Sequence, residues 1–493
     1  MIGVSKQMVR IFAKGGILTP SYLIGILKIA KKTGNKHVHF GSRQDILFQV
    51  STAQMPIIND GFKSLQTDYV VHGRKGTQFQ NIVSSYVSSD MAAATSWLSS
   101  GTYLFILEQF NFKPTLRINI ADPKQSLVPL FYGHLNFIAS SLKDYWYLYI
   151  RRDEISVPER WPVMILSSDI SLLSKNIETE WPKLLYGGIS GFFAYLNEKT
   201  NYNWRKIEND LTLDSIPPQD YEGFGKMNAS VNYWAGFYWR NNSYDISFLE
   251  EMCSLCLRTN ISKICLTPWK SFLIKEINEK DLIHWHRLLG RFGINMRHSS
   301  FELNWHLPLL DKQALKLKRY IVKKFDKVDV CVHGLTFGIK TKQEPALTNV
   351  LIEKKHGLKF MKELDPFITY KIYHTRNFNA NTWLYEEYMT HVSRKHLPGA
   401  LQNVASKYYA QLLDTAERIE HNPKIEKTDN SYVYQCQTCF SIHDEQTGDS
   451  NRGIAANTKF SDLPETFCCP LCEAPKSSFR KTQMSKIIQE ANL

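Results

Sequence analysis

Apolar residues recur at helical spacing after Thr19, and this pattern predicts the first helix of the chain. The positions that share its buried face are Leu23, Ile24, Leu27 and Ala30. Thr19 and Pro20 suit the N-cap and the first helical position, and Gly34 is expected to end the helix. Residues 37–40 and 45–50 are predicted to be strands on either side of a turn.

The same order of elements recurs about 220 residues later. Residues 236–240 predict a strand, residues 246–257 a helix, and residues 264–274 a strand region with a turn at Thr267. A repeat of this length excludes short-repeat solenoids, so the chain is expected to contain two copies of one α+β unit.

The helix predicted at residues 246–257 carries cysteines on its apolar stripe. The stripe has the spacing i, i+3, i+4, i+7 and i+8 and consists of Leu249, Met252, Cys253, Cys256 and Leu257. Cysteine on such a stripe serves as a small apolar residue. Residues 375–420 are also predicted to be helical, with a break at residues 397–399.

The composition is that of a globular protein, with 493 residues of which 43% are hydrophobic, enough for about three domains. No apolar run approaches the ~18 residues that span a membrane, and no secretory signal is recognised, so no membrane partner and a cytoplasmic location are expected. The nine cysteines lack the spacing of a secreted disulfide scaffold, which fits a reducing compartment.

The net charge of +13 is distributed unevenly along the chain. Residues 431–479 contain six acidic and three basic residues, which leaves +16 on the rest. A basic surface can hold anionic ligands, dock an acidic segment or bind nucleic acid, and it can equally be a solvated surface. Nucleic acid is not the partner that the sequence favours.

Two Cys-x-x-Cys pairs near the C-terminus have the spacing of metal ligands. Cys436 and Cys439 precede Cys469 and Cys472 by a gap of 29 residues. Each pair can wrap a turn around one ion and present two thiolates, so the spacing predicts a tetrahedral site with four sulfur ligands. Softness and geometry leave iron and zinc as the candidate metals.

The segment around these pairs resembles rubredoxin. The residues that carry the resemblance are Tyr434, Gly448, Asp449, Gly453, Ile454, Phe460, Asp462, Leu463, Pro464 and Pro470. The resemblance implies one iron ion (Fe²⁺/Fe³⁺) on the four cysteines, with structural zinc as the alternative. It also implies an electron carrier that needs a redox partner protein, either a reductase or an oxidase.

The segment departs from the rubredoxin pattern at three positions. Phe440 and Glu473 stand where a glycine follows each cysteine pair, and Phe467 stands where a tryptophan is customary. The missing glycines bear on the backbone N–H groups around the sulfurs, which tune the potential of the iron.

The order of the first elements, with Ser42-Arg43-Gln44 in the turn, resembles the ferredoxin-like half-domain of siroheme-dependent nitrite and sulfite reductases. Duplicated halves are also a property of that family. The resemblance implies that the arginine of the turn faces the cofactor. If siroheme binds, the cations expected near its carboxylates are Arg43, Arg74, Lys75, Lys113 and Arg117.

Several cations and cysteines that are expected in that family are missing. Gln80 stands where an arginine is expected, and Thr115 stands where a second lysine is expected. The cysteine spacings Cys-x5-Cys and Cys-x3-Cys of the four-iron cluster do not occur, so no 4Fe–4S cluster is expected. The sequence leaves siroheme binding open and indicates no catalytic residue.

These observations predict an α+β chain with two nitrite/sulfite-reductase-like halves and a small rubredoxin-like metal domain. The expected division is residues 1–200, residues 201–420, a linker at residues 421–431, and the metal domain at residues 432–480. The favoured function is electron transfer by an iron centre attached to a reductase-like body. The alternatives are a siroheme-dependent reductase fed by that iron, and a non-catalytic zinc-ribbon protein with a basic surface for nucleic acid.

Overall fold

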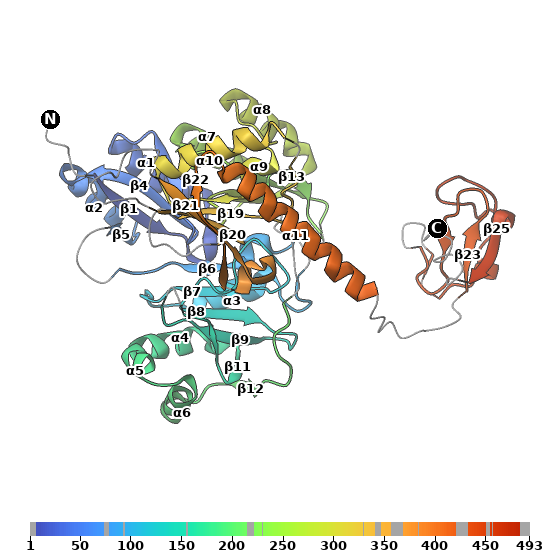
Figure 1. Ribbon diagram of the computed structural model, residues 1–493, viewed down its shortest axis with the longest axis horizontal. Coiled ribbons are helices and arrows are strands. Elements are labelled where there is room, and N and C mark those ends of the chain that lie inside the picture. Colours follow the sequence, from blue (N-terminus) through green and yellow to red (C-terminus); the bar gives the residue numbers. More distant parts are fainter. Residues whose placement is uncertain are drawn as a thin grey trace. The chain divides into compact units, whose positions relative to one another are not determined.

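The computed structural model shows a large unit and a small C-terminal unit (Figure 1). The large unit, here called the body, extends to Gln411, and the small unit, here called the lobe, begins at Leu412. The described residues are 6–72, 78–91, 94–153, 156–213, 221–228, 230–328, 330–340, 347–355, 368–382, 384–420, 432–449, 454–455 and 457–483. The predicted linker at residues 421–431 lies outside them.

The first predicted helix and strands are present at the predicted places. Helix α1 (Pro20–Lys32) begins after Thr19, whose hydroxyl oxygen accepts a hydrogen bond from the Tyr22 amide at 3.2 Å. It is followed by β3 (His37–Phe40) and β4 (Asp45–Ser51). The apolar face of the helix is buried as its spacing predicted.

Two five-stranded sheets of the body have the same construction, which confirms the predicted repeat. The first has the order β15-β3-β4-β1-β5 and includes β1 (Lys6–Phe12), β5 (Tyr69–His72) and β15 (Tyr244–Asp245). The second has the order β2-β16-β17-β14-β13 and consists of β2 (Ile17–Leu18), β16 (Ile264–Leu266), β17 (Phe272–Ile277), β14 (Tyr233–Phe237) and β13 (Gly223–Lys226). Helices α1 and α7 (Ile246–Arg258) occupy equivalent places in the two units and pack against each other.

Within the body, each of the two repeats contributes a short strand to the sheet of the other repeat. Strand β2, which precedes α1, pairs with β16 of the second unit, with Leu18 opposite Ile264. Strand β15, which precedes α7, pairs with β3 of the first unit, with Tyr244 opposite Val38. Each sheet is therefore completed at one edge by the other half of the chain.

A second pair of sheets is also duplicated. One has the order β12-β11-β9-β8-β7-β6, with β10 beside β9, and the other has the order β22-β21-β20-β19-β18. In both, three parallel strands are followed by antiparallel ones. The strands of the first are β6 (Ile82–Ser84), β7 (Ile118–Ala121), β8 (Leu135–Ala139), β9 (Tyr145–Ile150), β10 (Glu159–Arg160), β11 (Val163–Leu166) and β12 (Trp204–Lys206). Those of the second are β18 (Trp305–His306), β19 (Phe337–Lys340), β20 (Val350–Lys355), β21 (Thr369–Thr375) and β22 (Tyr385–Ser393).

The helices that connect these strands are duplicated as well. Helix α3 (Ser100–Gln109) connects β6 to β7, and α10 (Lys312–Phe325) connects β18 to β19. These two helices are therefore topological equivalents. The remaining helices are α2 (Met55–Ser64), α4 (Ile170–Thr179), α5 (Trp181–Tyr186), α6 (Ile189–Lys199), α8 (Leu282–Phe292), α9 (Ser300–Leu303) and α11 (Leu397–Glu420).

Three cysteines of the body lie in its core, as the apolar spacing predicted for two of them. Cys253 and Cys256 on α7 and Cys265 on β16 are each 0% exposed. Burial raises the pKa of each of these thiols, and that of Cys256 reaches about 12. They are neutral packing residues in this environment.

The prediction of helix throughout residues 375–420 was wrong for its first part. Residues 385–393 form β22, which pairs with β21 across the register from Thr369 opposite Ser393 to Thr375 opposite Tyr385. The helix begins only at Leu397, where a break had been predicted. The pairing with β21 outweighs the local preference because it supplies backbone hydrogen bonds to both ends of the segment, although the register shifts near Ile372.

The lobe is a small three-stranded sheet around an aromatic cluster. Its strands β23 (Tyr432–Cys436), β24 (Ile442–His443) and β25 (Phe479–Gln483) have the order β24-β23-β25 and are antiparallel. The rings of Tyr434 and Phe460 are stacked with centroids 4.1 Å apart, and Phe467 packs edge-on against Phe460. So small a core is typical of domains that depend on a metal for stability.

Among the helices that the described residues form, none is both long and apolar enough to cross a membrane.

Candidate metal centre

Two loops of the lobe have nearly the same conformation, and each contains one cysteine pair. In the first, the Phe440 amide donates to the Cys436 carbonyl at 2.9 Å. In the second, the Glu473 amide donates to the Cys469 carbonyl at 3.0 Å. Phe440 and Glu473 have φ values of 62° and 59°, in the left-handed region that favours glycine. The two departures from the glycine pattern therefore keep the turn, at a cost in backbone strain.

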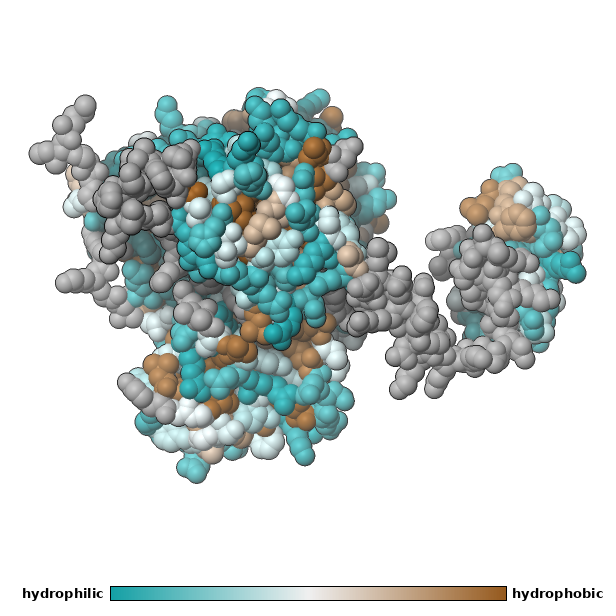
Figure 2. All heavy atoms as spheres, viewed as in Figure 1, coloured by the Kyte–Doolittle hydropathy of each residue, from teal (hydrophilic) through white to brown (hydrophobic). Residues whose placement is uncertain are grey.

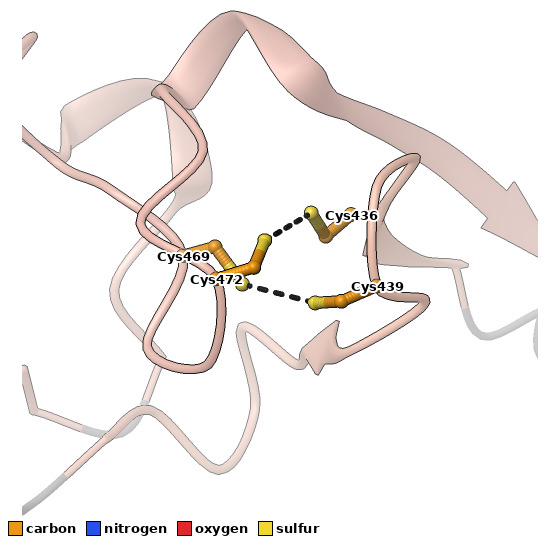
Figure 3. Close-up of side chains that lie close together, drawn as sticks. All are labelled: Cys436, Cys439, Cys469 and Cys472. Carbon is orange, nitrogen blue, oxygen red and sulfur yellow. Dashed lines mark hydrogen bonds between the residues drawn. The ribbon is translucent and has the colours of Figure 1, made fainter.

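The two loops face each other and bring their sulfur atoms together (Figure 3). The Sγ atoms of Cys436 and Cys472 are 3.7 Å apart, and those of Cys439 and Cys469 are 3.4 Å apart. The four Sγ atoms lie within 4.8 Å of one another. This is the donor set of a tetrahedral metal site, and it joins the four cysteines that the sequence singled out.

Backbone amides of both loops favour charge on the sulfurs. Burial raises the pKa of the Cys436 thiol, but the amides of Cys439 and Thr438 lower it below its ordinary value, and the amides of Leu471 and Cys472 act in the same direction on Cys469. Such N–H groups stabilise negative charge on the ligands of a metal centre.

The thiols of this cluster differ in how readily they ionise. Burial by itself raises the pKa of the Cys469 thiol, but hydrogen bonds, from Ser441 first, lower it to about 6. The pKa of Cys472 is raised to about 12, because burial and the neighbouring sulfurs oppose another negative charge although the Ala474 amide favours it. The cluster therefore needs a cation before all its sulfurs can be thiolates.

Sequence reasoning missed one residue of this centre. The Oγ atom of Ser441 lies 2.9 Å from the Sγ atom of Cys469 and 3.4 Å from that of Cys439. The signal available in the sequence was a hydroxyl residue two positions after a ligand cysteine, at the point where the chain leaves the turn.

Lys476 follows the second ligand loop and ties it to the segment that contains Ser461 and Leu463. The Lys476 ammonium donates to the Leu463 carbonyl at 2.6 Å and to the Ser461 carbonyl at 3.2 Å.

Large apolar side chains are exposed on the lobe at Tyr432, Phe440, Ile442 and Leu471. Figure 2 shows apolar residues gathered at one end of the lobe. Since Phe440 and Leu471 adjoin ligand cysteines, part of this apolar surface lies beside the centre.

In the body, Arg43 is buried, and both terminal nitrogen atoms of its guanidinium are hydrogen-bonded to protein groups. Its guanidinium donates to the Asn119 side chain at 2.6 Å and to the carbonyls of Asn81 and Ile118 at 2.6 and 2.9 Å. Burial lowers the pKa of Arg43 to about 9, and the positive charge of Arg117 is the next largest cause of this shift. Arg43 therefore joins the turn after β3 to strands β6 and β7.

The other cations expected near a cofactor lie in different surroundings. Lys113 is exposed and forms an ion pair of 2.6 Å with Asp68. The backbone amide of Arg117 donates to Nδ1 of His134 at 3.0 Å, and its side chain reaches the same ring. Arg74 and Lys75 lie outside the described residues. Of the described cations, Arg43 and Arg117 lie close enough for their charges to interact, whereas Lys113 is paired with Asp68.

The turn equivalent to Ser42-Arg43-Gln44 in the second unit contains Trp269 and Lys270. Gln44 and Lys270 both have positive φ values, 56° and 62°. The Trp269 indole donates to the Leu127 carbonyl at 3.0 Å, and two cavities of about 40 Å³ adjoin this ring. Cofactor pockets are usually ~300–1,000 Å³. The two cavities beside Trp269 are therefore smaller than a usual cofactor pocket.

Comparisons with known proteins agree with both resemblances. A family model described as Rubredoxin matches residues 433–479, and one described as Nitrite/Sulfite reductase ferredoxin-like half domain matches residues 4–65. The structure of the NirA protein of Mycobacterium tuberculosis aligns with a TM-score of 0.63 at 12% identity, over 86% of this chain and 82% of that one. At this identity the similarity shows the fold alone.

Three curated relatives each match about a tenth of the chain. Probable Rubredoxin-2 of Methanocaldococcus jannaschii is 48% identical over 48 residues, which are 10% of this chain and 86% of that protein. Rubredoxin-2 of Desulfovibrio desulfuricans is 45% identical over 51 residues, 10% of this chain and 82% of that protein. High molecular weight rubredoxin of Moorella thermoacetica is 46% identical over 48 residues, 10% of this chain, but the chain spans only 21% of its length.

Proposed function

The chain belongs to the rubredoxin family through its C-terminal domain, and from this premise we propose that it is an electron-transfer protein with one iron ion on the four lobe cysteines. The observation that carries the proposal is the approach of four sulfur atoms from two loops to within 4.8 Å of one another. Iron held by four thiolates takes up and releases one electron without a change of ligands.

The protein's residues supply what such a centre needs. The cysteine pairs provide four ligands, and the amides around Cys436 and Cys469 stabilise their negative charge. In the proposed cycle, an electron-donating redox protein loses one electron and the ferric ion becomes ferrous. An electron acceptor then takes the same electron, so no bond is formed or broken.

We further propose that residues 421–431 tether the lobe to the body. A tether of this length keeps the lobe at a high effective concentration near any acceptor that the body binds.

The test is the metal and absorption spectrum of the full-length protein after expression in iron-replete medium. The expected result is one iron per chain with the absorption bands of a ferric thiolate centre, bleached by one equivalent of reductant and restored by air. A matched variant, Cys439→Ser, should lose these bands.

Two results would overturn the proposal. Zinc in place of iron under these conditions would make the lobe a structural zinc ribbon. Iron that cannot be reversibly reduced would show that the centre does not carry electrons. A haem absorption band from cells that synthesise siroheme would instead support the reductase alternative and give the body a catalytic role.

A further inference from the structure

Helix α10 carries a row of cations on its exposed face. Lys312, Lys316, Arg319 and Lys323 follow one another at intervals of four, three and four residues, and Lys327 follows in the turn after the helix. These intervals place the helical members on one face, at steps of about 5–6 Å along the axis. The five residues, here called the basic stripe, are all exposed.

The charges of the basic stripe are not neutralised within the described part of the chain. None of its five side chains is in ion-pair contact with a carboxylate there. The carboxylate of Asp311 accepts from the amides of Gln313 and Ala314 as the helix cap. In Figure 1 α10 runs near the top of the body.

The duplicated architecture provides an internal comparison. Helix α3 has the same topological place in the first half as α10 in the second, yet it contains no lysine or arginine. Its exposed residues include Phe105 and Glu108. The fold therefore does not require cations on this helix, and the basic stripe needs another explanation.

The stripe lacks the features of a protein or membrane interface. No large apolar residue of α10 is among the exposed ones. Stable protein interfaces have an apolar centre, and interfacial helices insert apolar side chains into a membrane. A row of cations without such a centre suits the phosphate backbone of a nucleic acid, which binds by charge and by release of counterions.

We propose that the basic stripe binds the phosphate backbone of a nucleic acid. The probe is a fluorescent 20-nucleotide single-stranded DNA, titrated with full-length, metal-loaded protein at several salt concentrations. Five phosphate contacts predict a slope of log affinity against log salt of roughly −3.5. The quadruple variant Lys312→Gln, Lys316→Gln, Arg319→Gln and Lys323→Gln should bind at least tenfold more weakly, with most of the slope lost.

A matched variant controls for net charge. Lys28→Gln, Lys32→Gln, Lys63→Gln and Lys175→Gln remove the same charge from exposed positions on other helices and should leave binding within twofold. An equal loss in this variant would show non-specific attraction and overturn the proposal. Tighter binding of polyglutamate, or of vesicles with anionic lipids, through the same stripe would overturn it in favour of an acidic protein or a membrane.

A second inference rests on the proposed function and concerns Ser441. Its hydroxyl lies 2.9 Å from the Cys469 sulfur, and the sulfurs of a metal centre are thiolates that can only accept hydrogen bonds. The geometry points to Ser441 as a positioning residue that donates to Cys469 and stabilises the reduced centre, whose sulfurs carry more negative charge.

The test is the midpoint potential of the iron in Ser441→Ala. The expected result is a tenfold lower ratio of reduced to oxidised iron at a fixed ambient potential, or about 59 mV for one electron. Ser441→Thr should restore the potential, and Ser461→Ala, elsewhere in the lobe, should leave it unchanged. An unchanged potential with iron bound would overturn this inference alone, whereas absence of iron from the unmodified protein would overturn the proposed function.

Discussion

In the lobe, four sulfur atoms from two loops lie within 4.8 Å of one another. In the body, the described cations expected near a cofactor are already engaged, Arg43 by three oxygen atoms and Lys113 by Asp68. The lobe thus presents a donor set that a metal completes. The body uses comparable polar residues to hold its own strands together. Polar residues at the positions expected to bind a cofactor can therefore serve to pack the strands of the same fold.

The largest expected effect comes from breaking the sulfur cluster. Cys439→Ser should abolish stoichiometric iron and the cooperative unfolding of the lobe, because so small a core depends on the free energy of metal binding. Metal analysis and calorimetry of the full-length protein measure both, and the unfolding transition of the body should stay in place. Cys468→Ser, next to a ligand, is the control and should keep its iron. Loss of iron there would identify a different ligand set.

The next effect tests whether Arg43 is structural. Arg43→Ala should destabilise the body by ~3 kcal/mol, because it leaves three buried acceptors without their donor. Thermal unfolding measures the change, and the iron content of the lobe should not alter. Lys113→Ala removes only an exposed ion pair and should cost under ~1 kcal/mol. If the two variants were equally stable, the contrast between body and lobe would lose its basis.

Acid should weaken the body through His134. Burial, followed by the charges of Arg117, Arg43 and Arg151, lowers the pKa of His134 from 6.5 to about 3. Between these values the unfolded chain binds a proton that the folded body does not. Stability therefore falls as the pH drops below 6.5, by ~1.4 kcal/mol per pH unit for this group. Urea unfolding at pH 6.5, 5.5 and 4.5 measures the slope, which should be shallower by one proton in His134→Gln.

The smallest effect concerns the strained turns of the lobe. Phe440→Gly and Glu473→Gly should each stabilise the metal-bound lobe by ~0.5–1 kcal/mol, since glycine adopts positive φ at little cost. The midpoint of urea-induced loss of the metal absorption checks this. Leu471 lies in the same loop as Glu473 but has a negative φ. The variant Leu471→Gly should therefore destabilise the lobe by a similar amount. Equal shifts of all three variants would show that strain at these two residues is unimportant.

Sequence alone predicted the lobe well because its determinants are local. The spacing within and between the cysteine pairs specifies two turns and four ligands, and the structure brings these ligands together. Ser441 was missed because a hydroxyl in that position belongs to no recognised pattern. The sequence shows that a glycine is absent at Phe440, but a residue type does not give its φ angle. The backbone strain at this position therefore emerged only from the structure.

The body was harder to predict because its decisive contacts are distant in sequence. The partners of Arg43 lie 38 to 76 residues away, so nothing in the turn itself shows that the guanidinium is engaged. Strand β22 was mistaken for helix because its partner β21, and not its own residue pattern, determines its conformation. The repeat was predictable because both copies keep the same periodicities and the same turn.

The exchange of strands β2 and β15 has a consequence for synthesis on the ribosome. In the described part of the chain, the edge of strand β3 is covered by Tyr244 and Asp245, so this edge stays open until about half of the polypeptide has been made. An open edge strand is a template for pairing with other nascent chains. The first half is therefore expected to need chaperone protection during translation, and a truncation before residue 244 is expected to aggregate.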